Sequence, residues 1–201
     1  MMPVKQAFLL KPKVNKKPTG DVPLAEDYLV GAVNESSDWL LEVIKRIFNI
    51  LDHLTIDEHG KITELRNLVT YNGVTYQGIE DYFKYDPKHP DKKIHYSILK
   101  KLNAGNNSYE IRFGDKTYRG MKEFRIILTV HKKLNILVLT HGFSKRREIS
   151  NYYGIGTANE VTTQLGRVAS ELYVILNDEI NGLRATDSYL GKEGERHEVR
   201  L

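Results

Sequence analysis

The feature that most constrains the fold is a run of three predicted β-strands in the middle of the chain. The strands are predicted over residues 108–113, 123–130 and 135–141. In the first two, apolar and polar residues alternate, whereas the third is apolar on both faces, as in a strand that is covered on both sides. Because the joining loops are short, we expect the three strands to be antiparallel neighbours.

The polar face of these strands carries arginines. Arg112 in the first strand and Arg125 in the second lie opposite the apolar residues, and the third strand is followed by Lys145, Arg146 and Arg147. A planar guanidinium can hold two oxygens of one phosphate. The pattern therefore predicts that the sheet and its basic exit form a surface for RNA phosphates.

The charge of the chain is unevenly distributed. Residues 84–147 contain 16 Lys and Arg against 5 Asp and Glu, although the formal net charge of the whole chain is only +4. A polyanion would therefore be attracted to the middle of the chain. The alternative is that the lysines only make exposed faces soluble. For six lysines both interpretations stay open: Lys92, Lys93, Lys100, Lys101, Lys132 and Lys133.

Composition excludes several classes of site. The chain has no cysteine, so disulfides, thiol nucleophiles and cysteine zinc sites are excluded. Its 7 histidines show no HxxxH or HExxH spacing, and we expect no metal and no cofactor. No apolar run approaches the roughly 18–20 residues that span a bilayer, and the start lacks the features of a signal peptide. We therefore expect a cytoplasmic protein.

The rest of the chain is predicted to surround this core as one α+β domain over residues 35–183. An extended arm, residues 1–34, precedes it, with a short strand near 7–10, and a polar, mobile tail, residues 184–201, follows it. Asn72-Gly73 between two β-rich runs predicts an inserted hairpin near residues 66–77.

Four helices are predicted from the spacing of apolar residues. They cover residues 38–54, 79–85, 94–102 and about twenty residues after Thr157. The last begins at a capping box, because Thr157 and Glu160 have the required spacing.

The order of these elements, with the basic residues before the last helix, resembles the RelE/HigB superfamily of toxin ribonucleases, most closely its phage-related HigB-like branch. Residues 109–113 (YEIRF) resemble the family's YELRF strand, and residues 124–127 (FRII) resemble its YRIIY strand. Residues 136–145 (ILVLTHGFSK) are similar to the strand and exit ILLLHGFxKK. The resemblance covers residues 94–155, about a third of the chain.

The resemblance implies a small antiparallel sheet packed by N-terminal helices and a C-terminal helix. It also implies metal-independent cleavage of mRNA, usually on the ribosome, and a cognate antitoxin that covers the basic cleft. The 2′-hydroxyl would attack the adjacent phosphate, and cations would stabilise the phosphorane. Arg125 is the first candidate for that task and Arg112 the second, while His141 and Tyr152 (or Tyr153) are the candidates for proton transfer. The candidates for binding flanking phosphates are Lys145, Arg146, Arg147, Lys122 and Arg119.

Each of these residues also has a structural interpretation. The arginines can pair with Glu110 or Glu123, and His141 and the tyrosines can be packing residues. An Arg125 buried in an ion pair would count against catalysis. Two other functions therefore stay open: a non-catalytic nucleic-acid-binding protein of a phage or mobile element, and a protein-interaction domain that uses the N-terminal arm and the hairpin.

Overall fold

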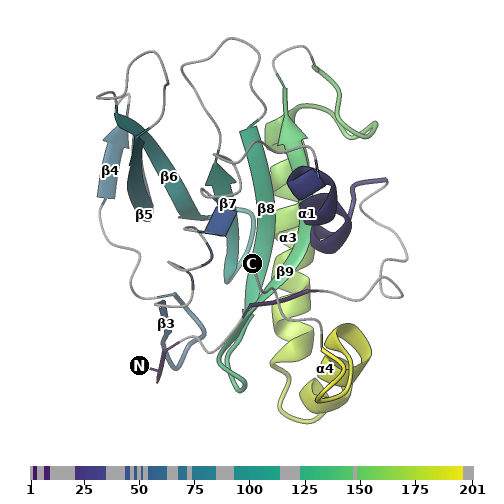
Figure 1. Ribbon diagram of the computed structural model, residues 1–201. Coiled ribbons are helices and arrows are strands. Elements are labelled where there is room, and N and C mark those ends of the chain that lie inside the picture. Colours follow the sequence, from purple (N-terminus) through teal and green to yellow (C-terminus); the bar gives the residue numbers. More distant parts are fainter. Residues whose placement is uncertain are drawn as a thin grey trace.

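The structure is a computed structural model, and it describes most of the chain. The described residues are 2–3, 7–9, 21–34, 44–45, 48, 51, 54–62, 68–71, 74–84, 93–113, 123–146 and 149–196. These residues form an α+β fold in which helices flank a sheet (Figure 1). Within the described ranges no helix combines the length and the apolar character that crossing a membrane requires.

One large sheet organises the fold. Its strands are β2 (Ala7–Leu9), β4 (Leu68–Tyr71), β5 (Val74–Lys84), β6 (Lys93–Lys101), β7 (Ser108–Phe113), β8 (Glu123–His131) and β9 (Ile136–Lys145). Among the described residues they lie in the order β2-β9-β8-β7-β6-β5-β4. β2 is parallel to β9 and the other neighbours are antiparallel. The short strands β1 (Met2–Pro3) and β3 (Thr55–Ile56) pair separately.

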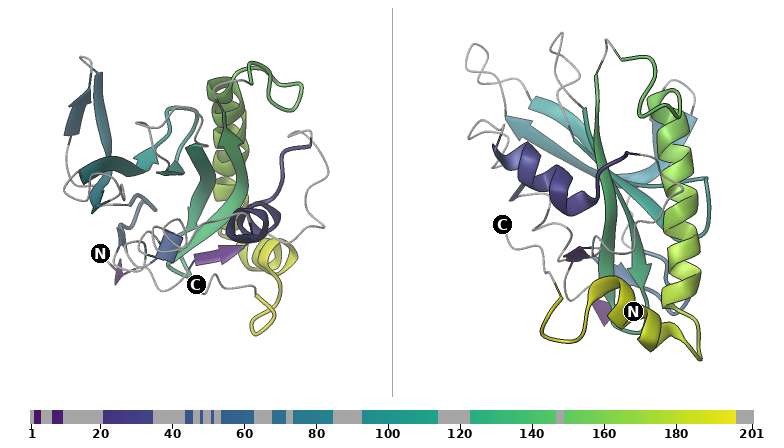
Figure 2. Two further views of the ribbon diagram at one scale, coloured as in Figure 1. Left: turned by 45° about the horizontal axis from the view of Figure 1, so that its top comes forward. Right: turned by 90° about the vertical axis from the view of Figure 1, so that its right-hand side faces the viewer.

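The sheet lies between two layers (Figure 2). Helix α3 (Ala158–Leu176) packs on one face, where it covers Ile127 and Phe143. Helix α1 (Ala25–Asn34) packs on the other face, against Phe124, Ile126 and Leu128. The same cluster contains Ile44, Phe48, Leu51, Leu54, Ile56 and Ile62. The three central strands are therefore antiparallel neighbours as predicted, and β8 is buried on both faces.

Two predicted helices are strands in the structure. Residues 79–85 and 94–102 were expected to be helical, but residues 79–84 belong to β5 and residues 94–101 to β6, and these strands pair antiparallel. The register shifts between Ile79 and Glu80, so Ile98 is the extra residue of a bulge. Ile98 and Leu99 are both fully buried, which breaks the strand alternation and imitates the spacing of a helix.

The N-terminal predictions are partly confirmed. The strand near residues 7–10 is β2, and the hairpin is formed by β4 and β5, with Tyr71 opposite Val74. The extended arm is wrong for residues 25–34, which form α1 and bury Ala25, Leu29 and Ala32 at helical spacing. Residues 44, 45, 48 and 51 of the predicted 38–54 helix are helical, Leu54 is not, and the other residues of this range lie outside the described residues.

The C-terminal half begins as predicted and then differs. Glu160 N–H bonds to Oγ1 of Thr157 and the Glu160 carboxylate accepts from Thr157 N–H, which confirms the capping box of α3. The mobile tail predicted from residue 184 is wrong for residues 184–190, because they lie in α4 (Gly182–Leu190). Leu190 is fully buried, and Oγ1 of Thr186 lies 2.7 Å from Nε2 of the buried His131.

Candidate nucleic-acid interface

Arg125 is held in ion pairs beneath α3. Only 5% of its side chain is exposed, and Nη1 lies 3.0 Å from Oε1 of Glu110. Nε donates to Oε1 of Glu123 over 2.8 Å, and Nη1 donates to Oγ1 of Thr162 on α3 over 3.0 Å. This geometry counts against the catalytic role predicted for Arg125, because two carboxylates neutralise the guanidinium and α3 covers it.

Arg112 lies beside this cluster and is more accessible. It is directly opposite Arg125 in the β7–β8 ladder, so both side chains lie on the α3 face of the sheet. Burial alone would raise the pKa of Glu123, but Arg125 and then Arg112 outweigh burial and hold that pKa below its usual value. The pKa of Lys100 is lowered by burial and then by Arg112. Positive charge therefore remains on this face after Arg125 is neutralised.

Two of the candidates for proton transfer, His141 and Tyr152, are packed into the protein. His141 is 1% exposed, and burial lowers its pKa to about 4, so it is neutral and enclosed at physiological pH. Tyr152 is 5% exposed, and its ring meets Phe143 edge-on with centroids 6.1 Å apart. These positions count against the acid–base roles predicted for both residues, because both side chains are buried.

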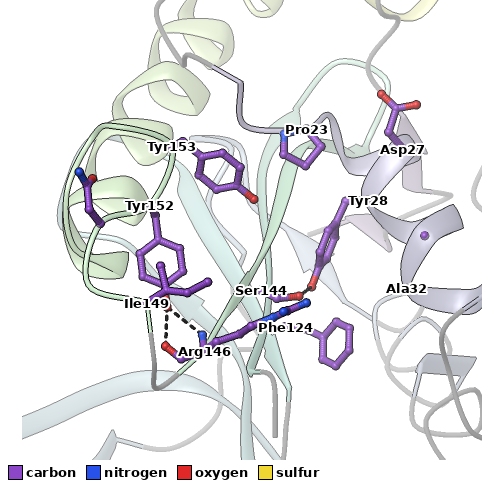
Figure 3. Close-up of a pocket in the computed structure, with 12 residues that line it drawn as sticks. Pro23, Asp27, Tyr28, Ala32, Phe124, Ser144, Arg146, Ile149, Tyr152 and Tyr153 are labelled. Atoms are coloured by element: carbon purple, nitrogen blue, oxygen red, sulfur yellow. Dashed lines mark hydrogen bonds between the residues drawn. The ribbon is translucent and has the colours of Figure 1, made fainter. Parts of the chain in front are cut away.

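Tyr152 instead fixes the backbone where β9 ends. Its hydroxyl accepts from the Arg146 N–H over 2.8 Å and donates to the Arg146 carbonyl over 2.7 Å. Both bonds are drawn in Figure 3. Arg146 is thereby held at a defined position while its side chain stays exposed. Tyr152 is a positioning residue for Arg146.

A cleft of about 410 Å³ opens beside Arg146, between α1 and the segment that joins β9 to α3. It is lined by Pro23, Asp27, Tyr28, Gly31, Ala32, Phe124, Ser144, Arg146, Ile149, Asn151, Tyr152 and Tyr153. Figure 3 shows Tyr28 and Tyr153 on opposite sides of the cleft, with the Arg146 side chain running from Tyr152 toward Ser144. Aromatic rings and a cation thus meet in one concave site.

The α1 side of the cleft is fixed by close packing on β9. The hydroxyls of Tyr28 and Ser144 lie 2.8 Å apart, and the rings of Tyr28 and Phe124 lie 6.1 Å apart, centre to centre. A Cβ atom at Gly142 would overlap the Tyr28 ring, so glycine is needed for this approach. Tyr28 can therefore lie at the cleft because Gly142 has no side chain.

The opposite side of the cleft contains a strained residue. Tyr153 has φ of 54°, a left-handed conformation that is costly for an aromatic residue, yet 40% of the residue is exposed. The turn is closed by the Tyr152 N–H, which donates to the Gly156 carbonyl over 2.6 Å. Burial raises the pKa of Tyr153, and Arg146 acts in the opposite direction. Strain that presents a half-exposed ring beside a cation indicates a binding role.

Part of the basic segment predicted after the third strand lies at or beside this cleft. Arg146 lies in the cleft and Lys145 is exposed at the end of β9, whereas Arg147, Lys122 and Arg119 lie outside the described residues. Sequence reasoning missed Asp27, Tyr28 and Ser144. The amphipathic spacing of residues 25–32 is the signal that could have predicted α1, the helix on which Asp27 and Tyr28 lie.

No group of three or more His, Cys, Asp and Glu side chains that could hold a metal ion is found in the described part of the chain. Comparison of the chain with models of protein families, with curated proteins and with solved structures found no match.

Proposed function

We propose that this protein binds single-stranded RNA, and that the cleft between α1 and the end of β9 holds one nucleotide. The observation that carries this proposal is the position of Arg146, which is exposed in the cleft beside Tyr28 and Tyr153. Single-stranded nucleic acids are bound by this combination, in which bases stack on aromatic rings and cations hold the phosphates.

The chemistry of the lining supports a nucleotide over an apolar ligand. Stacking of a base on Tyr153 or Tyr28 would leave its phosphate to Arg146, and Asp27 and Asn151 offer polar groups on the rim. The basic segment 84–147 would attract the polyanion from a distance. The proposal follows the non-catalytic alternative from the sequence, since Arg125, His141 and Tyr152 do not form a reaction centre.

The test is the affinity for a fluorescent single-stranded RNA, measured by anisotropy at several salt concentrations. Arg146→Gln should weaken binding about tenfold or more, because it removes a charged hydrogen bond to phosphate. The matched control is Arg184→Gln, which removes an exposed arginine of α4 at the opposite end of the molecule (Figure 1). Equal affinities of the wild type and Arg146→Gln would contradict the proposal.

A second candidate is the toxin-like endoribonuclease that the RelE/HigB resemblance implies, with mRNA as substrate and an antitoxin as partner. The specific observation in its favour is that the three resembling segments lie in the adjacent strands β7, β8 and β9. Arg146, which lines the cleft, directly follows β9. In this candidate Arg146, and not Arg125, stabilises the phosphorane.

Expression in bacteria from a tight promoter separates the two candidates. The endoribonuclease predicts growth arrest and new 5′ ends in mRNA, both abolished by Arg146→Gln. Binding without cleavage predicts normal growth and intact transcripts at confirmed expression, together with RNA affinity in vitro. Arg184→Gln again serves as the control with unchanged behaviour.

A further inference from the structure

We infer that a second phosphate subsite lies on the α3 face of the sheet, formed by Arg112 and Lys145, so that a bound RNA strand crosses the end of β9. We call these two residues the basic rim. The inference rests on the proposed function and extends it from one nucleotide to a strand of several. The basic rim is separate from the cleft, whose lining includes neither residue.

The alternation of side chains along β9 places cations on both faces of the sheet. Phe124 and Ser144 are opposite each other in the ladder and both line the cleft. The next pair, Glu123 and Lys145, therefore lies on the other face, where Glu123 bonds to Arg125. Lys145 and Arg146, which are adjacent in the sequence, thus lead from one face to the other.

The carboxylates of this face are already used by Arg125. Oε1 of Glu110 lies 3.0 Å from Arg125 Nη1, and Oε1 of Glu123 accepts from Arg125 Nε. No carboxylate in the described part of the chain makes an ion pair with Arg112, which is partly exposed. Glu110 and Glu123 balance the charge of Arg125, which lies directly opposite Arg112, so an added anion would meet the remaining charge of Arg112.

The residues around the basic rim also include positively charged side chains. Lys100 lies in the ladder beside Glu110, on this face, and its pKa is lowered by burial and by Arg112. Without counting Lys100, three cations of the described residues (Arg112, Arg125 and Lys145) face two carboxylates (Glu110 and Glu123). A phosphodiester, with one negative charge and a shape that a guanidinium fork can hold, fits this surplus.

The spacing suits a strand of nucleic acid. Arg112 and Lys145 belong to β7 and β9, which lie on either side of β8, about 10 Å apart at the usual strand spacing. A mononucleotide in the cleft does not reach Arg112 across these strands, whereas an oligonucleotide that continues past Lys145 does. The subsite therefore predicts that affinity rises with length and that only the added affinity depends on Arg112.

The experiment compares uridine 5′-monophosphate with hexauridylate by calorimetry on the full chain. Arg112→Gln and Lys145→Gln should each weaken hexauridylate binding about tenfold and leave the monophosphate unchanged. Each should reduce the salt slope for the hexamer by about 0.7, the value for one phosphate of a single strand. Arg146→Gln should weaken both ligands, and Arg184→Gln neither.

Unchanged hexamer affinity and salt slope in both rim variants, with binding lost in Arg146→Gln, would overturn the basic rim and leave the cleft standing. Loss of hexamer binding in the rim variants with no effect of Arg146→Gln would support the rim and overturn the cleft. A wild type that binds neither ligand would overturn both. The urea midpoint of each variant, expected to match the wild type, shows that a lost affinity is not lost folding.

Discussion

Replacing Arg125 by methionine should destabilise the protein strongly, because it leaves a buried carboxylate without its cation. Glu110 is 1% exposed and its Oε1 lies 3.0 Å from Arg125 Nη1. Removing one partner of a buried ion pair costs about 3–5 kcal/mol, whereas an exposed pair is worth about 1 kcal/mol or less. The contacts with Glu123 and Thr162 are lost as well, so we expect a value near the upper end for Arg125→Met.

The assay is urea denaturation followed by circular dichroism, with the free energy of unfolding compared at equal slopes. The double variant Arg125→Met/Glu110→Gln should recover most of the loss, because the most deeply buried carboxylate is then removed and Glu123, whose side chain is 20% exposed, still reaches solvent. The exposed Arg184→Gln should stay within about 0.5 kcal/mol of the wild type.

A loss below about 1 kcal/mol for Arg125→Met would refute this account of the buried cluster. It would mean that Arg125 spends its time in solvent and is available to a phosphate. Equal losses in the single and the double variant would show that packing alone, and not the ion pair, is responsible.

Three further predictions concern the cleft and the core. Tyr153→Asn should leave the free energy of unfolding almost unchanged, because asparagine tolerates the left-handed conformation, while RNA affinity measured by anisotropy falls by the roughly 1–3 kcal/mol of one stacked base. Tyr152→Phe should weaken RNA binding although Tyr152 itself does not contact RNA, because the backbone of Arg146 loses both hydrogen bonds to the Tyr152 hydroxyl. An affinity equal to that of the wild type would contradict the positioning role of Tyr152. The free energy of unfolding should fall as the pH drops from about 6.5 toward 4, because burial lowers the folded-state pKa of His131 and of His141 to about 4. In this range the unfolded chain binds more protons than the folded chain. Urea midpoints that do not change between pH 7.5 and 4.5 would contradict this prediction.

The sequence predicts the centre of this fold well because its signals are local. Alternation in β7 and β8, the apolar run of β9 and the Thr157–Glu160 capping box depend on neighbouring residues only. β6 was mistaken for a helix because its bulge buries Ile98 and Leu99 together. That irregularity is produced by pairing with β5, and no local pattern reveals it.

The site was harder to predict because it depends on contacts between distant residues. The alternation of residues predicted that Arg125 lies on the face of β8 opposite Phe124 and Ile126, and the structure confirms this. Whether that face meets solvent or α3 depends on Thr162, 37 residues further along the chain. Tyr28 reaches the cleft through its packing against Gly142, which sequence spacing does not indicate. The prediction that Arg146 binds phosphate rests on a local feature, the basic segment that follows a strand end.

The most direct test of the central claim is to find where RNA touches the protein. Irradiation of the complex with an oligonucleotide that contains 4-thiouridine, followed by mass spectrometry of the crosslinked peptides, identifies the residues against which a base lies. The account predicts crosslinks to Tyr153 or Tyr28, reduced in Arg146→Gln and unchanged in Arg184→Gln. Crosslinks confined to α4 or to the outer face of α3 would contradict the cleft as the RNA site.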